Sequence, residues 1–173
     1  LCADGTLWAL GRNDDDRMSL LSDDTGATLV SPLKITNDVA QVAVCGTKTA
    51  IVKHDGSLWV WDSKTPPAKL LDAVRSVALS STHGLALMRN GTLMAWGDNA
   101  HGQLGDTAHK SSSTPVPVAK SDTGGFSVVS LAAADGLSIA ITADGKLHRW
   151  GRAAGAKDPR LFPEQAPQLP LEN

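Results

Sequence analysis

Short apolar runs alternate with polar turns along the chain, and no window shows the i, i+3, i+4, i+7 apolar stripe of an amphipathic helix. At four places two such runs flank an Asp-Gly or Asn-Gly dipeptide, at residues 4–5, 55–56, 90–91 and 144–145. This dipeptide is a strong signal for a tight β-hairpin and predicts a type I′ turn, in which both central residues have positive φ. The pattern therefore predicts an all-β fold built on four related hairpins.

The strand after each hairpin repeats the sequence Asx-Gly-x-Leu-x-x-Trp, with Leu10 in the Trp position of the first copy. We interpret the repeated residues as a structural signature, whose Trp side chains pack between units rather than stack on a ligand. His83, in the strand before the third hairpin, is expected to make a structural hydrogen bond rather than bind metal or act as a base. The residues assigned to this signature are Gly5, Gly56, Gly91, Gly145, Trp61, Trp96, Trp150 and His83.

Each unit also has a strand of small residues upstream of its hairpin and a proline-bearing segment downstream. The proline segments lie at residues 31–35, 66–71, 114–118 and 166–171, and proline is confined to sheet edges. Four short antiparallel strands per unit predict a β-propeller blade. The units span approximately residues 1–38, 39–73, 74–124 and 125–173.

Residues 1–173 are thus predicted to form a single partial β-propeller. Leu1 aligns with Leu87, at the end of a second strand, so the first unit is half a blade and the chain holds about 3.5 blades. The sequence favours a piece of a longer chain over copies that associate to complete the ring. Because each blade buries its faces against its neighbours, an isolated monomer of this length is expected to be marginally stable.

Composition excludes several function classes. A hydrophobic content of 42%, a charged content of 20% and a net charge of −2 are ordinary for a soluble globular protein and make nucleic acid an unlikely partner. No apolar run reaches the roughly 20 residues of a membrane helix, so no membrane partner is expected. Cys2 and Cys45 are too few for a disulfide scaffold and are interpreted as small, partly buried fillers. The sequence does not indicate a cellular compartment.

The third unit carries the fullest set of repeated segments, namely Val77-Ala78, residues 83–87, 90–93, Trp96-Gly97 and the Asn-x-x-Gly-Gln-Leu-Gly sequence at 99–105. With these segments in series, the chain resembles the regulator of chromosome condensation repeat family. The resemblance implies a propeller, typically of seven blades, and partners that in this family include small GTPases, chromatin and, in bacteria, secreted enzymes. The shortened second unit, which lacks the Asn-x-x-Gly-Gln-Leu-Gly loop, is more similar to bacterial members, or to a fragment of one. No nucleotide-exchange residue of the family is matched here.

The loops after the Trp strands differ most between units, so we expect them to carry function. The partner-binding candidates are Arg12, Asp14, Asp15, Asp16, Arg17, Asn99 and His101. The aspartates could bind a cation, but without EF-hand spacing we interpret them as a solvated acidic loop. The last unit is basic at Arg149, Arg152, Lys157 and Arg160, and the opposite charges suggest the hypothesis of end-to-end association.

No phosphate loop, metalloprotease motif, nucleophile elbow or Cys/His cluster is present in the sequence, so we predict no enzyme activity, no cofactor and no metal. The predicted function is a non-catalytic protein–protein interaction module that binds a protein partner through its inter-strand loops. Two alternatives stay open. One is a guanine-nucleotide exchange factor-like regulator of a small GTPase, and the other is a structural scaffold whose copies associate through open blade edges to complete the propeller.

Overall fold

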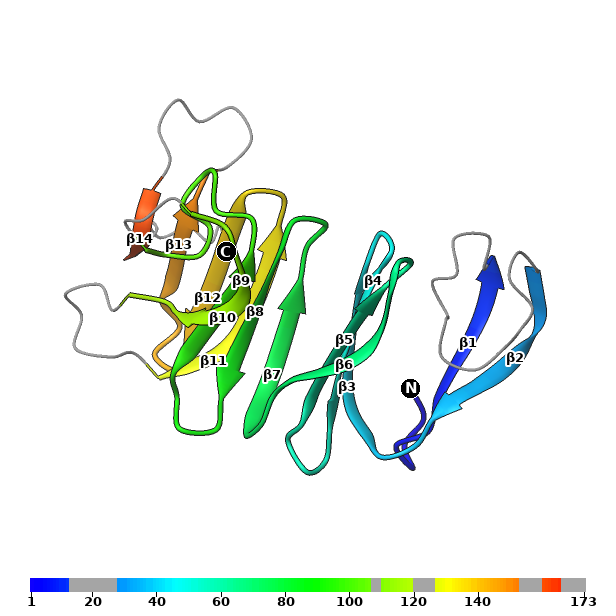
Figure 1. The fold of residues 1–173 in the computed structure, drawn as a ribbon. Coiled ribbons are helices and arrows are strands. Elements are labelled where there is room, and N and C mark those ends of the chain that lie inside the picture. Colours follow the sequence, from blue (N-terminus) through cyan, green and yellow to red (C-terminus); the bar gives the residue numbers. More distant parts are fainter. Residues whose placement is uncertain (13–27, 107–109, 120–126, 153–159, 166–173) are drawn as a thin grey trace, which may run out of the picture.

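A computed structural model describes residues 1–12, 28–106, 110–119, 127–152 and 160–165 of the 173-residue chain (Figure 1). Regular structure in these residues consists of strands, without a helix, arranged in three four-stranded antiparallel sheets and one two-stranded sheet. We call the two-stranded sheet the half-blade and the others the second, third and fourth blades. Figure 1 shows the four sheets side by side in chain order. The predicted all-β partial propeller is confirmed.

Strands neighbouring in the chain are neighbours in each sheet. The half-blade consists of β1 (Leu7–Arg12) and β2 (Thr28–Thr36). The second blade consists of β3 (Val39–Cys45), β4 (Lys48–Lys53), β5 (Leu58–Asp62) and β6 (Thr65–Leu71). The third blade consists of β7 (Val74–Leu79), β8 (His83–Met88), β9 (Leu93–Gly97) and β10 (Ser112–Pro117). The fourth consists of β11 (Val128–Ala134), β12 (Leu137–Thr142), β13 (Leu147–Gly151) and β14 (Arg160–Gln165).

The proline segments at 31–35 and 66–71 lie within the outermost strands β2 and β6, and β10 holds most of the segment at 114–118. The fourth segment was expected at residues 166–171, which lie outside the described residues. The strand that pairs with β13 is instead β14, which comes earlier in the chain. The sequence of β14 contains Pro163, so the outermost strand of this blade also carries a proline. The approximate boundaries of the four units stay a prediction.

The four hairpins share one turn, and it is not the predicted type I′ turn. Their glycines have φ between 78° and 91°, whereas Asp38 and Ala73 are the non-glycine residues with positive φ in the described part of the chain. In the second blade the Gly56 amide donates to the Lys53 carbonyl (2.9 Å), and the Lys53 amide donates to the Ser57 carbonyl (3.0 Å). This is a type I turn followed by a G1 bulge, which needs positive φ at the glycine alone.

The Asp or Asn before each glycine has a different role from the one predicted. Asp55 Oδ1 accepts a hydrogen bond from the Ser57 amide (2.7 Å), and Asn90 Oδ1 accepts one from the Thr92 amide (3.0 Å). A side chain that bonds the main chain two residues on forms an Asx turn. The Asx-Gly dipeptide is therefore explained by a side-chain cap and a bulge glycine.

Consecutive blades are joined at the hairpin end. The Val39 amide, at the start of β3, donates to the Gly5 carbonyl, and the Val74 amide, at the start of β7, donates to the Gly56 carbonyl, both at 2.9 Å. Further along the inner strands, the Gln41 side-chain amide makes two hydrogen bonds with the main chain of Val77, at 3.0 and 2.9 Å. The hairpin of one blade thus fixes where the next blade begins.

Three apolar cores lie between successive sheets. The half-blade and second blade share Leu7, Ile35, Val39, Ile51 and Trp61. The second and third blades share Ala50, Val52, Leu58, Val74, Val77 and Ala86. The core between the third and fourth blades includes Leu85, Leu87, Leu93, Leu104, Val118, Val128 and Trp150. In this core Trp150 is fully buried. The signature Trp side chains of the second and fourth blades thus pack between sheets.

Candidate functional site

The third and fourth blades present a set of connections at the end of the propeller opposite the hairpins (Figure 1). We call this surface the loop face and define it by the turn at 80–82 between β7 and β8, the loop at 98–106 after β9, and the turn at 135–136 between β11 and β12. It contains the candidates Asn99 and His101. Many side-chain and main-chain hydrogen bonds hold the described residues of this surface.

Two buried side-chain amides hold the loop at 98–106. Asn99 Oδ1 accepts from the Leu104 amide (2.9 Å), and Asn99 Nδ2 donates to Asp106 Oδ1 (2.6 Å). Gln103 Nε2 donates to Asp98 Oδ2 (2.7 Å), and Gln103 Oε1 accepts from the His101 amide (2.9 Å). Both amides are fully buried. They satisfy main-chain groups that a strand would otherwise pair, so the loop has a defined shape without belonging to a sheet.

The fourth blade anchors the same loop. The Gln103 carbonyl accepts hydrogen bonds from Trp150 Nε1 (2.9 Å) and from Ser138 Oγ (2.7 Å). Leu104 next to it is 0% exposed and belongs to the core between the two blades. The loop therefore seals the boundary between the third and fourth blades.

His83 lies directly beneath this anchor and is 2% exposed. Its Nε2 lies 2.8 Å from Ser138 Oγ, and its Nδ1 lies 2.9 Å from Ser80 Oγ. Since Ser138 Oγ donates to the Gln103 carbonyl, the arrangement suits a neutral ring that donates from Nε2 and accepts at Nδ1. Burial lowers the pKa of His83 to about 4, although Asp98 and Asp135 oppose the shift. His83 is thus neutral at physiological pH and links two blades.

The outer surface of the loop face is polar. Ser81 Oγ donates a short hydrogen bond to Asp135 Oδ1 and so joins the turns of the two blades. The His101 ring lies against Gly136, since a Cβ there would stand 3.2 Å from His101 Cδ2. Partial burial alone would raise the pKa of Asp98, but hydrogen bonds from Ser111, Ala100 and Gln103 outweigh it and hold the pKa below its ordinary value. Asp98 is therefore an ionised, firmly positioned carboxylate.

The predicted partner-binding residues are distributed unevenly. His101 is half-buried on the loop face, and Asn99 is buried beneath it, where its amide supports the loop. Arg12 ends β1. Asp14, Asp15, Asp16 and Arg17 lie outside the described residues, as does Lys157. Partner binding by these residues stays a prediction.

Sequence reasoning missed the residues that build the loop face around His101. Ser81 and Asp135 lie in turns and belong to no repeated pattern, so nothing in the sequence marks them as a pair. Ser138 occupies the strand position opposite Trp150, and the equivalent residues opposite Trp61 and Trp96 are Thr49 and Gly84. A comparison of that single position across the units would have shown its variation. The Gln103 carbonyl is a main-chain group and leaves no sequence signal.

The loop face holds His83 in an enclosed position. Both His83 ring nitrogens face buried serine hydroxyls, so neither is presented to a substrate. In the part of the chain that the structure describes, no three His, Cys, Asp or Glu side chains are grouped so that they could hold a metal ion. Those residues also form no helix long and apolar enough to cross a membrane.

Comparisons with known proteins identify the repeats. Residues 74–103 and residues 90–141 match two family models described as the regulator of chromosome condensation (RCC1) repeat. The chain is similar to the RCC1 domain-containing protein RUG3, mitochondrial, of Arabidopsis thaliana, with 25% identity over 183 aligned residues that cover 87% of this chain and 39% of that protein. The chain therefore spans well under half of this plant relative.

Two solved structures are similar in fold. Human WBSCR16 superposes with a TM-score of 0.78 at 21% identity, covering 97% of this chain and 50% of that chain. Prp20p of Saccharomyces cerevisiae, described with its binding to Gsp1p and histones, superposes with a TM-score of 0.77 at 17% identity, covering 97% and 49%. At these identities the likeness shows the fold alone. The part of the propeller present here corresponds to about half of each structure.

Proposed function

Since the chain belongs to the RCC1 repeat family, we propose that it is a non-catalytic protein-binding module that uses the loop face of its third and fourth blades. The observation that carries this proposal is the loop at 98–106. Its main chain lies outside the sheet, yet two buried amides and Trp150 hold it in one shape. A preorganised surface loop loses little conformational entropy on binding, which favours affinity for a partner.

The exposed groups on this loop suit a polar partner surface. His101 supplies a ring that is half exposed, and Asp98 supplies an ionised carboxylate on the same loop. The second blade has no equivalent, because its β5 and β6 are separated by residues 63–64 alone. A partner would therefore recognise the third and fourth blades rather than the repeat in general.

Affinity capture with matched variants tests this proposal. The wild-type chain and the double variant His101→Ala/Ser81→Ala are compared with His54→Ala, which changes a hairpin residue at the opposite end. We expect quantitative mass spectrometry of captured proteins to show a partner lost with the loop-face variant and retained with His54→Ala. Equal capture by all three proteins would contradict the proposal. Circular dichroism of each variant verifies that the sheets are intact.

A further inference from the structure

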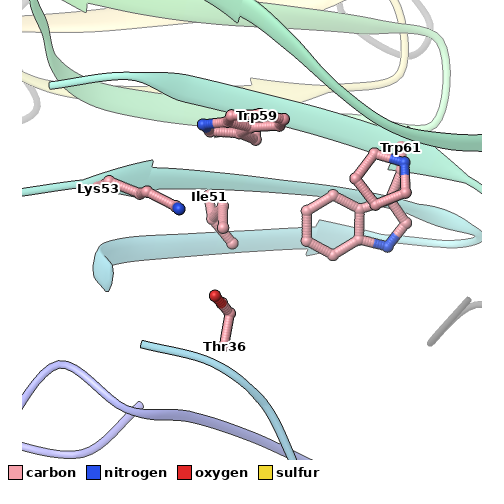
Figure 2. Close-up of a pocket in the computed structure, with 6 residues that line it drawn as sticks. Thr36, Ile51, Lys53, Trp59 and Trp61 are labelled. Atoms are coloured by element: carbon pink, nitrogen blue, oxygen red, sulfur yellow. The ribbon is translucent and has the colours of Figure 1, made fainter. Parts of the chain in front are cut away.

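A small apolar pocket lies between the half-blade and the second blade (Figure 2). It measures about 160 Å³ and is lined by Thr36, Ile51, Lys53, Trp59, Trp61 and Pro67. Ile51 and Trp61 form a buried floor, at 3% and 5% exposed, and Trp59 and Pro67 are half-buried. Figure 2 shows Thr36 facing the side chains of β4 and β5 from across the boundary. The pocket is at a distance from the loop face, since Lys53 and Trp59 flank a hairpin at the opposite end of the blade.

Two departures from the repeat accompany this pocket. Thr36 pairs with Leu7 as Leu71 pairs with Leu58, so Thr36 and Leu71 are equivalent positions. Lys53 and Met88 are also equivalent, because each closes the same hairpin turn. Leu71 and Met88 pack in the core between the second and third blades. The equivalent space between the half-blade and the second blade holds the shorter Thr36 and the charged Lys53. These two side chains leave part of that space unfilled, and the unfilled part is the pocket.

Lys53 gives the pocket a charge. Its Nζ lies 5.4 Å from the ring centroid of Trp59, within the range of a cation–π interaction. No carboxylate in the described residues forms an ion pair with it, and the ion pairs there are Lys69 with Asp72 and Lys146 with Asp144. An ammonium group at the rim of an indole-lined pocket favours a ligand that is apolar inside and anionic at the edge.

We propose that this pocket is a docking site for an acidic peptide segment of a partner, which inserts one leucine-sized apolar side chain between Trp59, Trp61 and Thr36. A carboxylate of a neighbouring Asp or Glu in that segment pairs with Lys53. At about 160 Å³ the pocket is smaller than the roughly 300–1,000 Å³ of sites for drug-sized molecules, and it suits a single side-chain anchor. The site is separate from the loop face, so the two surfaces can be tested independently.

The five tryptophans provide a direct readout. The probe is acetyl-Gly-Glu-Leu-Glu-Gly-amide, titrated into the nitrogen-15-labelled chain while the indole N–H signals are followed by NMR. We expect saturable shifts of the Trp59 and Trp61 signals with a dissociation constant on the order of 1 mM, as suits one anchor residue. The Trp150 signal is expected to stay in place. Acetyl-Gly-Glu-Ser-Glu-Gly-amide, which lacks the anchor, is expected to bind more than about tenfold more weakly.

Two variants restore the residues of the neighbouring repeat. Thr36→Leu fills the pocket and is expected to abolish the shifts without loss of folding, because Leu occupies the equivalent position 71. Lys53→Met keeps the anchor but is expected to weaken binding by roughly fivefold, the upper value for a partly exposed ion pair. Lys64→Met, which removes an exposed lysine of the same blade, is the matched control and should bind as the wild type does.

Several outcomes would overturn the docking site. These are the absence of saturable shifts, undiminished binding by Thr36→Leu, and equal binding of acetyl-Gly-Lys-Leu-Lys-Gly-amide. Benzoate that binds as tightly as the acidic peptide would indicate a site for small aromatic anions and would equally overturn peptide docking. Dispersed indole signals of each variant establish that it is folded. None of these variants changes the loop face, so failure here leaves the proposed function standing.

Discussion

Two boundaries between blades each bury a tryptophan at the same position of the repeat. The boundary between the third and fourth blades is filled around that tryptophan, whereas the boundary between the half-blade and the second blade has a pocket beside it. At the first boundary Trp150 is fully buried, and its ring nitrogen bonds the loop that carries Leu104 into the core. At the second, Trp61 is also buried, but the space beside it remains open as a pocket. Trp61 thus lines a pocket, whereas Trp150 is enclosed, and the described residues around each tryptophan account for this difference.

The tryptophan of the repeat is buried at both boundaries, but it does not define a closed interface by itself. Closure between the third and fourth blades requires a loop from the preceding blade, held by Asn99 and Gln103. Between the half-blade and the second blade, Thr36 and Lys53 replace the apolar residues that fill the equivalent space one repeat later. Variation between repeats therefore changes the surface of the propeller while each blade keeps its strand order.

The largest expected effect comes from removing the indole at the sealed boundary. Trp150→Ala empties a fully buried position and deprives the Gln103 carbonyl of a donor. We expect a loss of about 3–5 kcal/mol in the free energy of unfolding, measured by urea denaturation. Trp8→Ala is the control, because Trp8 lies in β1 of the half-blade and is 44% exposed, and its loss should be well below that of Trp150→Ala. Equal losses would show that the boundary is not sealed by Trp150.

A glycine pair tests how closely β13 approaches the turn at 135–136 of the same blade. Gly151 and Gly145 both have positive φ, at 86° and 78°. A Cβ at Gly151 would collide with the Gly136 carbonyl, whereas a Cβ at Gly145 would have no atom within 4 Å. We expect Gly145→Ala to cost about 1–2 kcal/mol from backbone strain alone, and Gly151→Ala to cost about 1–3 kcal/mol more from the collision. Thermal unfolding of the two variants measures the difference.

The sealed boundary should also respond to acid through His83. Its folded-state pKa of about 4 lies below the ordinary 6.5, so between these values the unfolded chain binds a proton that the folded chain does not. Stability therefore falls as the pH falls from about 6.5 to about 4, by at most about 3 kcal/mol, and this contribution levels off below that. Burial also lowers the pKa of His148, which acts in the same direction.

Urea denaturation at a series of pH values checks the acid response. His83→Gln, which keeps a side chain able to hydrogen bond without titrating, should flatten the dependence in this window. Acid sensitivity that is unchanged in His83→Gln would assign the effect to other groups. A decrease in the free energy of unfolding below pH 4 has a different cause, because Asp98 and other carboxyls with lowered pKa values protonate there.

The smallest effect is expected at the open boundary. Thr36→Leu adds apolar atoms to the pocket and should raise the free energy of unfolding by up to about 1 kcal/mol. Thr114→Leu, at an exposed position of β10, should change stability by less than about 0.5 kcal/mol. A destabilised Thr36→Leu variant would mean that the walls of the pocket are too rigid to accept the side chain.

Much of the fold could be predicted from the sequence because its signals are local. The Asx-Gly dipeptides and the Trp four to six residues later mark the hairpins and third strands of the blades. The turn type was predicted wrongly because a type I′ turn and a type I turn with a G1 bulge both place glycine at positive φ. The dipeptide does not distinguish them. The Asp55 bond to the Ser57 amide shows that the aspartate is there for its side chain.

The site was harder to predict because the polarity of a side chain does not show whether it points into the protein or toward solvent. Asn99 and His101 were selected from one loop, yet Asn99 is fully buried and supports the loop while His101 faces outward in part. The bond between Ser81 and Asp135 joins residues from different blades, and a pairing of this kind depends on how the sheets stack. The pocket had a weak signal, since Thr36 and Lys53 interrupt positions that are apolar in the next repeat.

At the hairpin end, main-chain hydrogen bonds from Val39 to Gly5 and from Val74 to Gly56 join the half-blade to the second blade and the second blade to the third. The start of the inner strand in the second and third blades is thus fixed at the hairpin end, and the connections at the opposite end of the sheets can differ in length. Residues 63–64 connect β5 to β6, whereas residues 98–111 connect β9 to β10 in the same sheet layout. Connections at the end opposite the hairpins can therefore vary while the sheets keep their strand order. A foreign loop grafted between β5 and β6 should accordingly leave the second blade folded.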